Sequence, residues 1–368
     1  MFSQSRLAAS AAALLAIAAV VGCTKKDEAA APEPVAAVAK PEFKVCWTIY
    51  AGWMPWEYGG TQGIVSKWAD KYGIDIDVVQ INDYVESINQ YTAGAFDGCT
   101  MTNMDALTIP AAGGVDSTAL VVGDFSNGND GIVLKGSGKS LADLKGLPVN
   151  LVELSVSHYL LARGLETVGL AERDLQVVNT SDADIVAAFA TPDVKAAVTW
   201  NPLLAEITAM SDTTQVFDSS QIPGEIIDLM VVNTATLAAH PELGKALTGA
   251  WYEIMSIMSA DSDAGVAART HMAQASGTDL AGYEAQLAAT RMFYQPADAL
   301  AFVTSAELPA TMEKVAAFSF THGLLGEGAA DAGAVGMAYP GDITTGNAEN
   351  IKLRYTDTFL KLAVDGAL

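Results

Sequence analysis

Basic side chains are scarce in this sequence. Among 368 residues, 20 Lys and Arg stand against 43 Asp and Glu, and the formal net charge at pH 7 is −23. A negative field of this size repels phosphate backbones, so we expect no nucleic-acid partner. Residues 72–134 contain no Lys, Arg or His but nine Asp and Glu. A pocket built from that segment has no side-chain cation to neutralise an anion, which disfavours an anionic ligand even though a helix N-terminus can bind one unaided.

Histidine and cysteine are also rare, with four His and three Cys. The histidines are His158, His240, His271 and His322. They are scattered without metal-binding spacing, and no nucleophile elbow or cysteine-rich tract is present, so we expect no metal and no cofactor. Cys46 and Cys99 fall in two predicted strands that neighbour each other. An oxidising compartment permits a disulfide between them, and two buried free thiols fit the sequence equally well.

Long apolar runs are missing as well. The run at residues 14–21 is too short to cross a bilayer, which takes about 20 apolar residues. It follows a single basic residue, Arg6, and leads to small residues, which indicates a signal peptide over residues 1–22. Val20-Val21-Gly22-Cys23 resembles the bacterial lipobox, which implies lipidation of Cys23 and a membrane anchor. Residues 23–41, rich in Ala and Pro with few groups to bury, predict a flexible tether.

Aromatic side chains gather in one stretch, Trp53-Met54-Pro55-Trp56-Glu57-Tyr58. It follows a predicted strand at 45–50 and precedes a predicted helix at 61–68. In open α/β sheets, ligands bind outside the carboxyl ends of the strands. Two indoles there offer flat walls for a small planar or cationic molecule, with Glu57 as a counter-charge. The alternative is that Trp53 or Trp56 only fills the top of a core.

Predicted strands and helices alternate along most of the chain. Strands are expected at 74–81, 96–101, 148–152, 175–178 and 196–200, with helices at 84–91, 158–170 and 182–190 between them. This alternation predicts parallel βαβ units. Two β runs around a polar turn at 120–134 predict a crossing between two lobes, and 226–232 predicts the return. We expect lobe 1 over 42–131, lobe 2 over 132–228, and a return to lobe 1 with C-terminal helices over 229–368.

Four segments in this order resemble one family. They are the loop at 53–58 after the first strand, Tyr-Thr-Ala-Gly-Ala-Phe-Asp-Gly at 91–98, Ser-Leu-Ala-Asp-Leu-Lys-Gly at 140–146, and Ala-Val-Thr-Trp-Asn-Pro at 197–202. The chain is similar to periplasmic substrate-binding proteins of the nitrate/taurine/sulfonate type that serve ABC importers. The resemblance implies an α/β, two-lobe periplasmic-binding-protein fold of type II, with a mainly parallel, helix-flanked sheet in each lobe. Residues 50–57 and 83–105 look most like the branch associated with urea carboxylase, which implies urea or guanidine.

The resemblance also implies which residues face the ligand. They are Trp53, Trp56, Asn103, Asp105, Asp124 and Asn127 in lobe 1, Glu153, Ser155, Ser157 and Trp200 in lobe 2, and Glu225 or Asp228 near the hinge. Asn and Ser suit neutral urea, which needs donors and acceptors, whereas carboxylates and an aromatic face suit planar guanidinium. The surplus of acids favours the cation. The alternative for each acid is a helix cap or a solvated loop, and for Trp200 it is packing between the lobes.

The expected function is that of a monomeric, lipid-anchored binding protein in the periplasm or on the outer face of the cell membrane. It would close on a small neutral or cationic nitrogen compound by hinge motion and present it to an ABC permease. One alternative is an enzyme on the same scaffold acting on a small amide or amidine. Ser157 and His158 are its best candidates, but neighbouring residues on a helix point about 100° apart. Another alternative is a surface lipoprotein that binds a protein.

Overall fold

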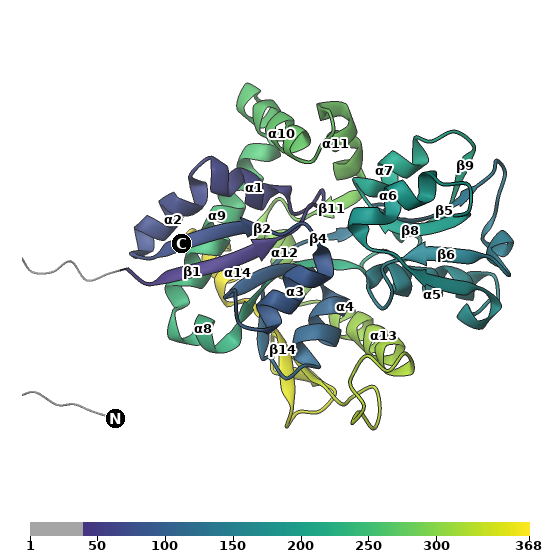
Figure 1. Cartoon of the computed structure of the whole chain (residues 1–368). Coiled ribbons are helices and arrows are strands. Elements are labelled where there is room, and N and C mark those ends of the chain that lie inside the picture. The colour runs from purple at the N-terminus through teal and green to yellow at the C-terminus, as the bar shows by residue number, and fades with distance from the viewer. Residues whose placement is uncertain (1–39) are drawn as a thin grey trace, which may run out of the picture. The chain divides into compact units, whose positions relative to one another are not determined.

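The computed structural model describes residues 40–368, which form two α/β lobes with one sheet each (Figure 1). The larger sheet has the strand order β13-β12-β14-β4-β10-β3-β1-β2, with β11 added on β4, and the smaller has the order β7-β6-β8-β5-β9. The predicted signal peptide, the lipidation site Cys23 and nearly all of the tether lie outside the described residues. Within residues 40–368, no helix has the length and apolar character needed to span a membrane.

Lobe 1 contains the larger sheet. Its strands are β1 (Glu42–Trp47), β2 (Asp75–Gln80), β3 (Gly98–Thr102), β4 (Ser117–Ser126), β10 (Ile227–Asn233), β11 (Thr290–Met292), β12 (Gly336–Tyr339), β13 (Ile343–Thr345) and β14 (Ile351–Tyr355). Its helices are α1 (Met54–Thr61), α2 (Ile64–Tyr72), α3 (Tyr84–Thr92), α4 (Asn103–Ala106), α8 (Thr234–Ala239), α9 (Pro241–Met258), α10 (Asp263–Ala275), α11 (Leu280–Ala288), α12 (Pro296–Val303), α13 (Glu307–Thr321) and α14 (Thr358–Val364). All five residues of β3 are buried, as expected for a central strand covered on both faces.

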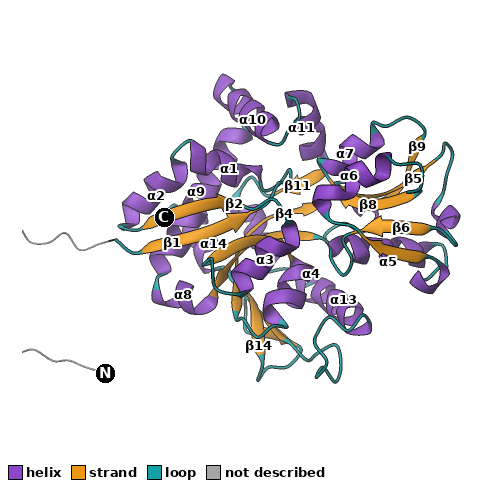
Figure 2. Cartoon of the chain, viewed as in Figure 1, coloured by secondary structure: helices purple, strands orange, loops and turns teal. Residues whose placement is uncertain are grey.

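Lobe 2 contains the smaller sheet. Its strands are β5 (Asp130–Lys135), β6 (Pro148–Leu151), β7 (Gln176–Asn179), β8 (Ala196–Trp200) and β9 (Thr213–Asp218), and its longer helices are α5 (Val156–Thr167), α6 (Asp182–Ala190) and α7 (Leu203–Thr208). Figure 2 shows helices on both sides of these strands. Ser155 caps α5 by accepting a hydrogen bond from the Ser157 amide, which satisfies one of the free amides of the first turn.

The chain crosses between the lobes twice, at 127–129 between β4 and β5 and at 219–226 between β9 and β10. These crossings lie next to the boundaries expected after residues 131 and 228. The return strand β10 runs antiparallel to both of its neighbours, β3 and β4. In lobe 2, β5 is antiparallel to both β8 and β9. Both sheets are therefore mixed rather than mainly parallel, because the strands that adjoin the crossings run against their neighbours.

Two local features differ from the sequence-based expectation. The aromatic stretch is not a loop: α1 begins at Met54, and Pro55 lies in its first turn. A proline there costs nothing, because the first amides of a helix have no partner within the helix. The region after residue 240 is not only helical, since β12, β13 and β14 extend the larger sheet at one edge.

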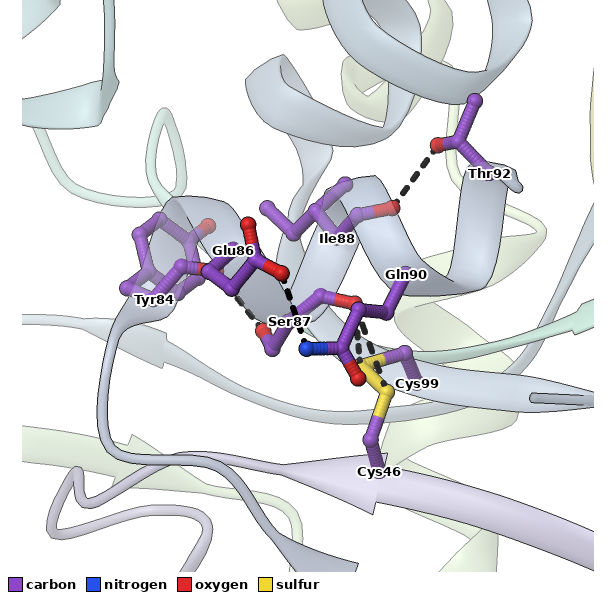
Figure 3. Close-up of a disulfide and its surroundings, with 8 residues drawn as sticks. All are labelled: Cys46, Tyr84, Glu86, Ser87, Ile88, Gln90, Thr92 and Cys99. Atoms are coloured by element: carbon purple, nitrogen blue, oxygen red, sulfur yellow. Dashed lines mark hydrogen bonds between the residues drawn. A yellow bond between two sulfur atoms is a disulfide. The ribbon is translucent and has the colours of Figure 1, made fainter. Parts of the chain in front are cut away.

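A disulfide joins Cys46 on β1 to Cys99 on β3 (Figure 3). The two residues are in register on parallel neighbouring strands, with their Cα atoms 4.4 Å apart. The carbonyl oxygen of Ser87 on α3 lies 3.6 Å from one sulfur and 3.7 Å from the other. Of the two alternatives that the sequence left open, the structure therefore shows the disulfide.

We expect the disulfide to stabilise lobe 1. Its partners are 53 residues apart in sequence, and closing a loop of that length in the unfolded chain gives a stabilisation of about 4 kcal/mol or less. Cys46→Ala/Cys99→Ala should therefore lower the free energy of unfolding in urea by about 2–4 kcal/mol. When unfolding is measured in dithiothreitol, the free energy of unfolding of the wild type should fall to the same extent, and that of the double variant should not change. A wild type indifferent to reductant would contradict the prediction.

Candidate functional site

A cavity lies between the two lobes, at the carboxyl ends of β1, β3 and β8 and the beginnings of β5 and β10. It is lined by Tyr50, Trp53, Tyr84, Thr102, Asp130, Val156, Trp200, Ile226 and Asp228. It contains about 270 Å³ of space, open solvent included, of which the centre of a water molecule reaches about 10 Å³. One water already needs about 10–15 Å³ on this measure, so the cavity in this structure has room for about one water molecule.

Aromatic rings form the walls. Trp53, the N-cap residue of α1, stacks on Tyr84 with ring centroids 5.8 Å apart, and Tyr50 meets the edge of Trp53 at 5.0 Å. From lobe 2, Trp200 at the end of β8 contacts Tyr84 at 5.6 Å, so this ring pair closes the two lobes on each other. Trp53 and Trp200 are 5% and 7% exposed, and each therefore offers a desolvated indole to the cavity.

Carboxylates form the floor. Asp130 begins β5, and Asp228 is the second residue of β10. Asp124 lies directly opposite Asp228 on β4 and accepts a hydrogen bond of 3.3 Å from the Tyr50 hydroxyl. Asp105 accepts hydrogen bonds from the hydroxyls of Tyr84 (2.6 Å) and Thr102 (2.8 Å), both of which line the cavity. Two buried carboxyl groups thus line the cavity, and two more lie directly behind its lining.

Burial raises the pKa of each of these groups, because a low-dielectric surrounding penalises a charge. The pKa of Asp130 rises to about 7 and that of Asp105 to about 6, although hydrogen bonds from Ser126 and from Tyr84, respectively, act in the opposite direction. Asp228 has a pKa well above its ordinary range, through burial and then the proximity of Asp124. The pKa of Asp124 is raised by burial as well.

The described residues that line the cavity include no Lys, Arg or His. Several buried polar atoms at the cavity also have no hydrogen-bond partner within residues 40–368: Oδ2 of Asp228, Oδ2 of Asp124, Oδ1 of Asp105 and Nε1 of Trp53. A buried polar atom without a partner costs about 1–3 kcal/mol, and more if it is charged. Of these atoms, Oδ2 of Asp228 and Nε1 of Trp53 belong to residues that line the cavity, so one acceptor and one donor are available to a ligand, and a carboxylate acceptor suits a cation.

The structure brings part of the predicted set together. Trp53, Trp200 and Asp228 line the cavity, and Asp105 and Asp124 lie directly behind its lining. Trp56 does not line it. Trp56 lies in the second half of the aromatic stretch, where the helix turns its ring toward α9, and it packs on Trp251 with centroids 5.1 Å apart. Glu57 also points elsewhere and pairs with His271, with 3.0 Å between Oε2 and Nε2.

Asn103 and Glu225 hold the hinge rather than the cavity. The Asn103 amide nitrogen donates to the Glu225 carbonyl (3.1 Å), and its Oδ1 accepts from the Ile227 amide, which fixes the start of β10. The Glu225 carboxylate accepts hydrogen bonds from Tyr159, Arg163 and Lys314. Lobe 2 supplies Tyr159 and Arg163 from α5, and α13 supplies Lys314, so Glu225 is an ionic tie between α5 and α13.

The remaining predicted residues do not line the cavity. Asn127 is at the first crossing, where its backbone amide donates to the Ala289 carbonyl. Glu153 is exposed. Ser155 caps α5 and donates its hydroxyl to the Val152 carbonyl (2.7 Å). Ser157 is buried next to Val156, and its hydroxyl has no partner among the described residues.

Sequence reasoning missed six of the lining residues: Tyr50, Tyr84, Thr102, Asp130, Val156 and Ile226. Tyr50 follows β1 and Thr102 ends β3, so the rule that ligands bind beyond strand ends could have included both. Tyr84 follows the N-cap Asp83, in the same position relative to a cap as Val156 after Ser155. Asp130 is the first residue of β5. It could also have been predicted, because it is an acidic residue at a crossing between lobes.

A second cluster joins His158, Glu172 and His322, whose ligand atoms lie within 4.8 Å of one another. The Leu154 amide donates to Nδ1 of His158 (3.1 Å), so the proton of a neutral His158 ring is on Nε2. That nitrogen faces Glu172 at 3.3 Å and, while protonated, cannot bind a metal. His322 approaches the Phe318 carbonyl through Nδ1 (2.8 Å) and Glu172 through Nε2 (2.8 Å). The cluster is therefore a hydrogen-bonded contact that joins α5, the turn at Glu172–Asp174 and the end of α13.

The sequence also resembles known proteins. Over 138 residues it is 30% identical to a putative binding protein of Brucella abortus (strain 2308), and over 136 residues 31% identical to a putative aliphatic sulfonates-binding protein of Escherichia coli (strain K12). These matches cover 38% and 37% of this chain. They span 42% and 39% of the two relatives, so the chain matches less than half of the length of these curated proteins.

The fold resembles solved structures over a longer stretch. The alkanesulfonate-binding protein SsuA from Xanthomonas axonopodis pv. citri, bound to MOPS, superposes with a TM-score of 0.65 at 19% identity, covering 79% of this chain and 96% of that one. This likeness confirms the expected two-lobe periplasmic-binding-protein fold of type II. A model of the family described as NMT1/THI5 like matches residues 66–264, which is more than half of the chain. The chain therefore belongs to the NMT1/THI5-like family.

Proposed function

We propose that this protein is the substrate-binding component of an ABC importer and that it captures a small nitrogen-rich cation of the guanidine type between its lobes. One observation carries the proposal. The inter-lobe cavity has aromatic walls from both lobes and a floor of carboxyl groups, with no basic side chain among its described lining residues. Neutral urea is the second candidate, because the resemblance of residues 50–57 to the branch associated with urea carboxylase also implies it.

Charge decides between cation and anion. Two relatives are named for sulfonates, which are anions. An anion in this cavity would face Asp130 and Asp228 with no side-chain cation to balance it. A cation, in contrast, compensates the negative charge of the four carboxyl groups. Without a cation, burial opposes the ionisation of these groups.

Shape favours a planar guest. Guanidinium is a flat cation with donors around its edge, so carboxylates in its plane and an aromatic face above it bind it well. The unpartnered Oδ2 of Asp228 is an acceptor within this set, and Trp53 and Trp200 supply the faces. Urea would use the same acceptors for its amide donors and needs one donor for its carbonyl oxygen, for which Nε1 of Trp53 is available.

An enzymatic role receives no support from the relatives, which are named as binding proteins and not as enzymes, as expected from the sequence. The pair Ser157 and His158 does not form a catalytic couple, because His158 faces Glu172. The other parts of the proposal are a monomer, a lipid anchor at Cys23, a location in the periplasm or on the outer face of the cell membrane, and delivery to a permease.

Ligand charge gives the first test. In isothermal titration calorimetry at neutral pH, guanidinium chloride at millimolar concentration should bind saturably and release a measurable heat, whereas sodium chloride, taurine and nitrate should not. At 100 times the dissociation constant, the bound ligand should raise the free energy of unfolding by about 2.7 kcal/mol. Saturable binding of taurine or nitrate without binding of guanidinium would contradict the cation proposal.

The two indoles of the aromatic stretch give a matched pair of variants. Trp53→Ala removes a desolvated aromatic face worth about 2 kcal/mol, so the affinity for guanidinium should fall about tenfold or more. Trp56→Phe alters only the contact with Trp251, so it should lower the melting temperature while keeping the affinity near that of the wild type. Equal losses of affinity in both variants, or none in Trp53→Ala, would remove Trp53 from the site.

A further inference from the structure

We propose that the empty site holds a proton shared between Asp124 and Asp228, and that a bound cation expels this proton to solvent. Capture of the ligand is then an exchange of one cation for another. This inference rests on the proposed function, because it assigns the mechanism of charge balance to the same cavity. A cationic ligand and neutral urea then differ in whether binding releases the proton.

Geometry places the two carboxyl groups together. Asp228 on β10 and Asp124 on β4 are direct partners across an antiparallel pair, and they are 3% and 0% exposed. Each keeps an Oδ2 atom without a hydrogen-bond partner among the described residues. Gly52 packs against Asp124 from the other side: a Cβ there would lie 2.4 Å from Oδ2, so only glycine lets the backbone approach this carboxyl group so closely.

The groups that face this pair are acidic or phenolic. They are Tyr50 from the segment after β1, Asp130 from β5, and Tyr283 and Tyr294 from the C-terminal half of the chain. No basic side chain contributes to the environment of either Asp124 or Asp228. Two buried carboxylates without a counter-ion cannot both ionise, so one keeps its proton and donates it to the other. Burial is the largest cause of the raised pKa of Asp228, and the proximity of the Asp124 carboxyl group is the next.

The exchange balances in charge. In the empty site, the pair carries one proton and a net charge of −1. When guanidinium enters, the carboxyl O–H bond breaks, the proton goes to solvent, and both carboxylates are ionised: Asp228 accepts N–H donors of the ligand, and Asp124 keeps its hydrogen bond from Tyr50. One positive charge replaces another, so the net charge of the cavity does not change. Neutral urea brings no charge and therefore leaves the proton in place.

The exchange has two consequences for pH dependence. Guanidinium affinity should rise by up to about tenfold per pH unit until the empty pair loses its proton on its own. Stability of the empty protein runs the other way. The pKa of the pair is higher in the folded state than in the unfolded state. At pH values between these two pKa values the folded state binds more protons, so stability is lost as the pH rises through this range.

Calorimetry of guanidinium binding in phosphate and in Tris at pH 7.5, where both buffers hold the pH and Asp105 and Asp130 are mostly ionised, tests the inference. These buffers differ in their heat of protonation, so the difference in observed heat counts the protons released, and we expect about one per cation. Asp228→Asn should abolish this release, while Asp77→Asn, at an exposed position on β2, should keep it. Equal heats in both buffers, with binding intact, would overturn the inference and leave the proposed function standing. Absence of guanidinium binding in either buffer would overturn both.

A second measurement covers the case in which Asp228→Asn no longer binds. Thermal unfolding of the empty wild type should show a melting temperature that falls from pH 5 to pH 8. Asp228→Asn should flatten this decline, because it removes one of the two groups that share the proton, whereas Asp77→Asn should not. Identical pH profiles for wild type and Asp228→Asn would overturn the shared proton.

Discussion

The antiparallel insertion of β10 between β3 and β4 is the constraint on which the candidate site depends. Its register sets Asp228 opposite Thr102 on one side and Asp124 on the other. A shift by one residue would turn Asp228 to the opposite face of the sheet. Because β10 is also the strand on which the chain returns from lobe 2, the pairing that completes the lobe 1 sheet also delivers a carboxyl group to the cavity between the lobes.

The sequence predicted the fold well wherever one segment determined its own structure. Helix α3 could be predicted because Asp83 caps it, and β8 because Ala196–Trp200 is a short, mostly apolar run. Two features depended on distant partners or on position. The stretch expected to be a loop is helical, because Pro55 lies in the first turn, where proline is compatible with a helix. The short strands β12, β13 and β14 become strands through pairing at the sheet edge, which a local pattern does not reveal.

The site was harder to predict than the fold. Trp53 and Trp56 are three positions apart, and local sequence does not tell which ring meets the cavity, because the packing partner Trp251 comes from α9. The choice between Glu225 and Asp228 was equally hidden. Glu225 is neutralised by Arg163 and Lys314, which come from two different helices, and Asp228 has no such partner. Counter-ions that gather only in the folded chain thus decide which acid is left for a ligand.

Lobe closure strengthens the effect of that remaining charge. At an effective dielectric constant of about 20, two unit charges 4 Å apart interact by about 4 kcal/mol, which is about a thousandfold in affinity. Trp200 and Tyr84 meet at 5.6 Å across the lobes, next to the buried Asp228, so this interaction penalises an anion beside Asp228 and favours a cation by a similar amount. Neutral urea gains nothing from this term and depends on hydrogen bonds alone.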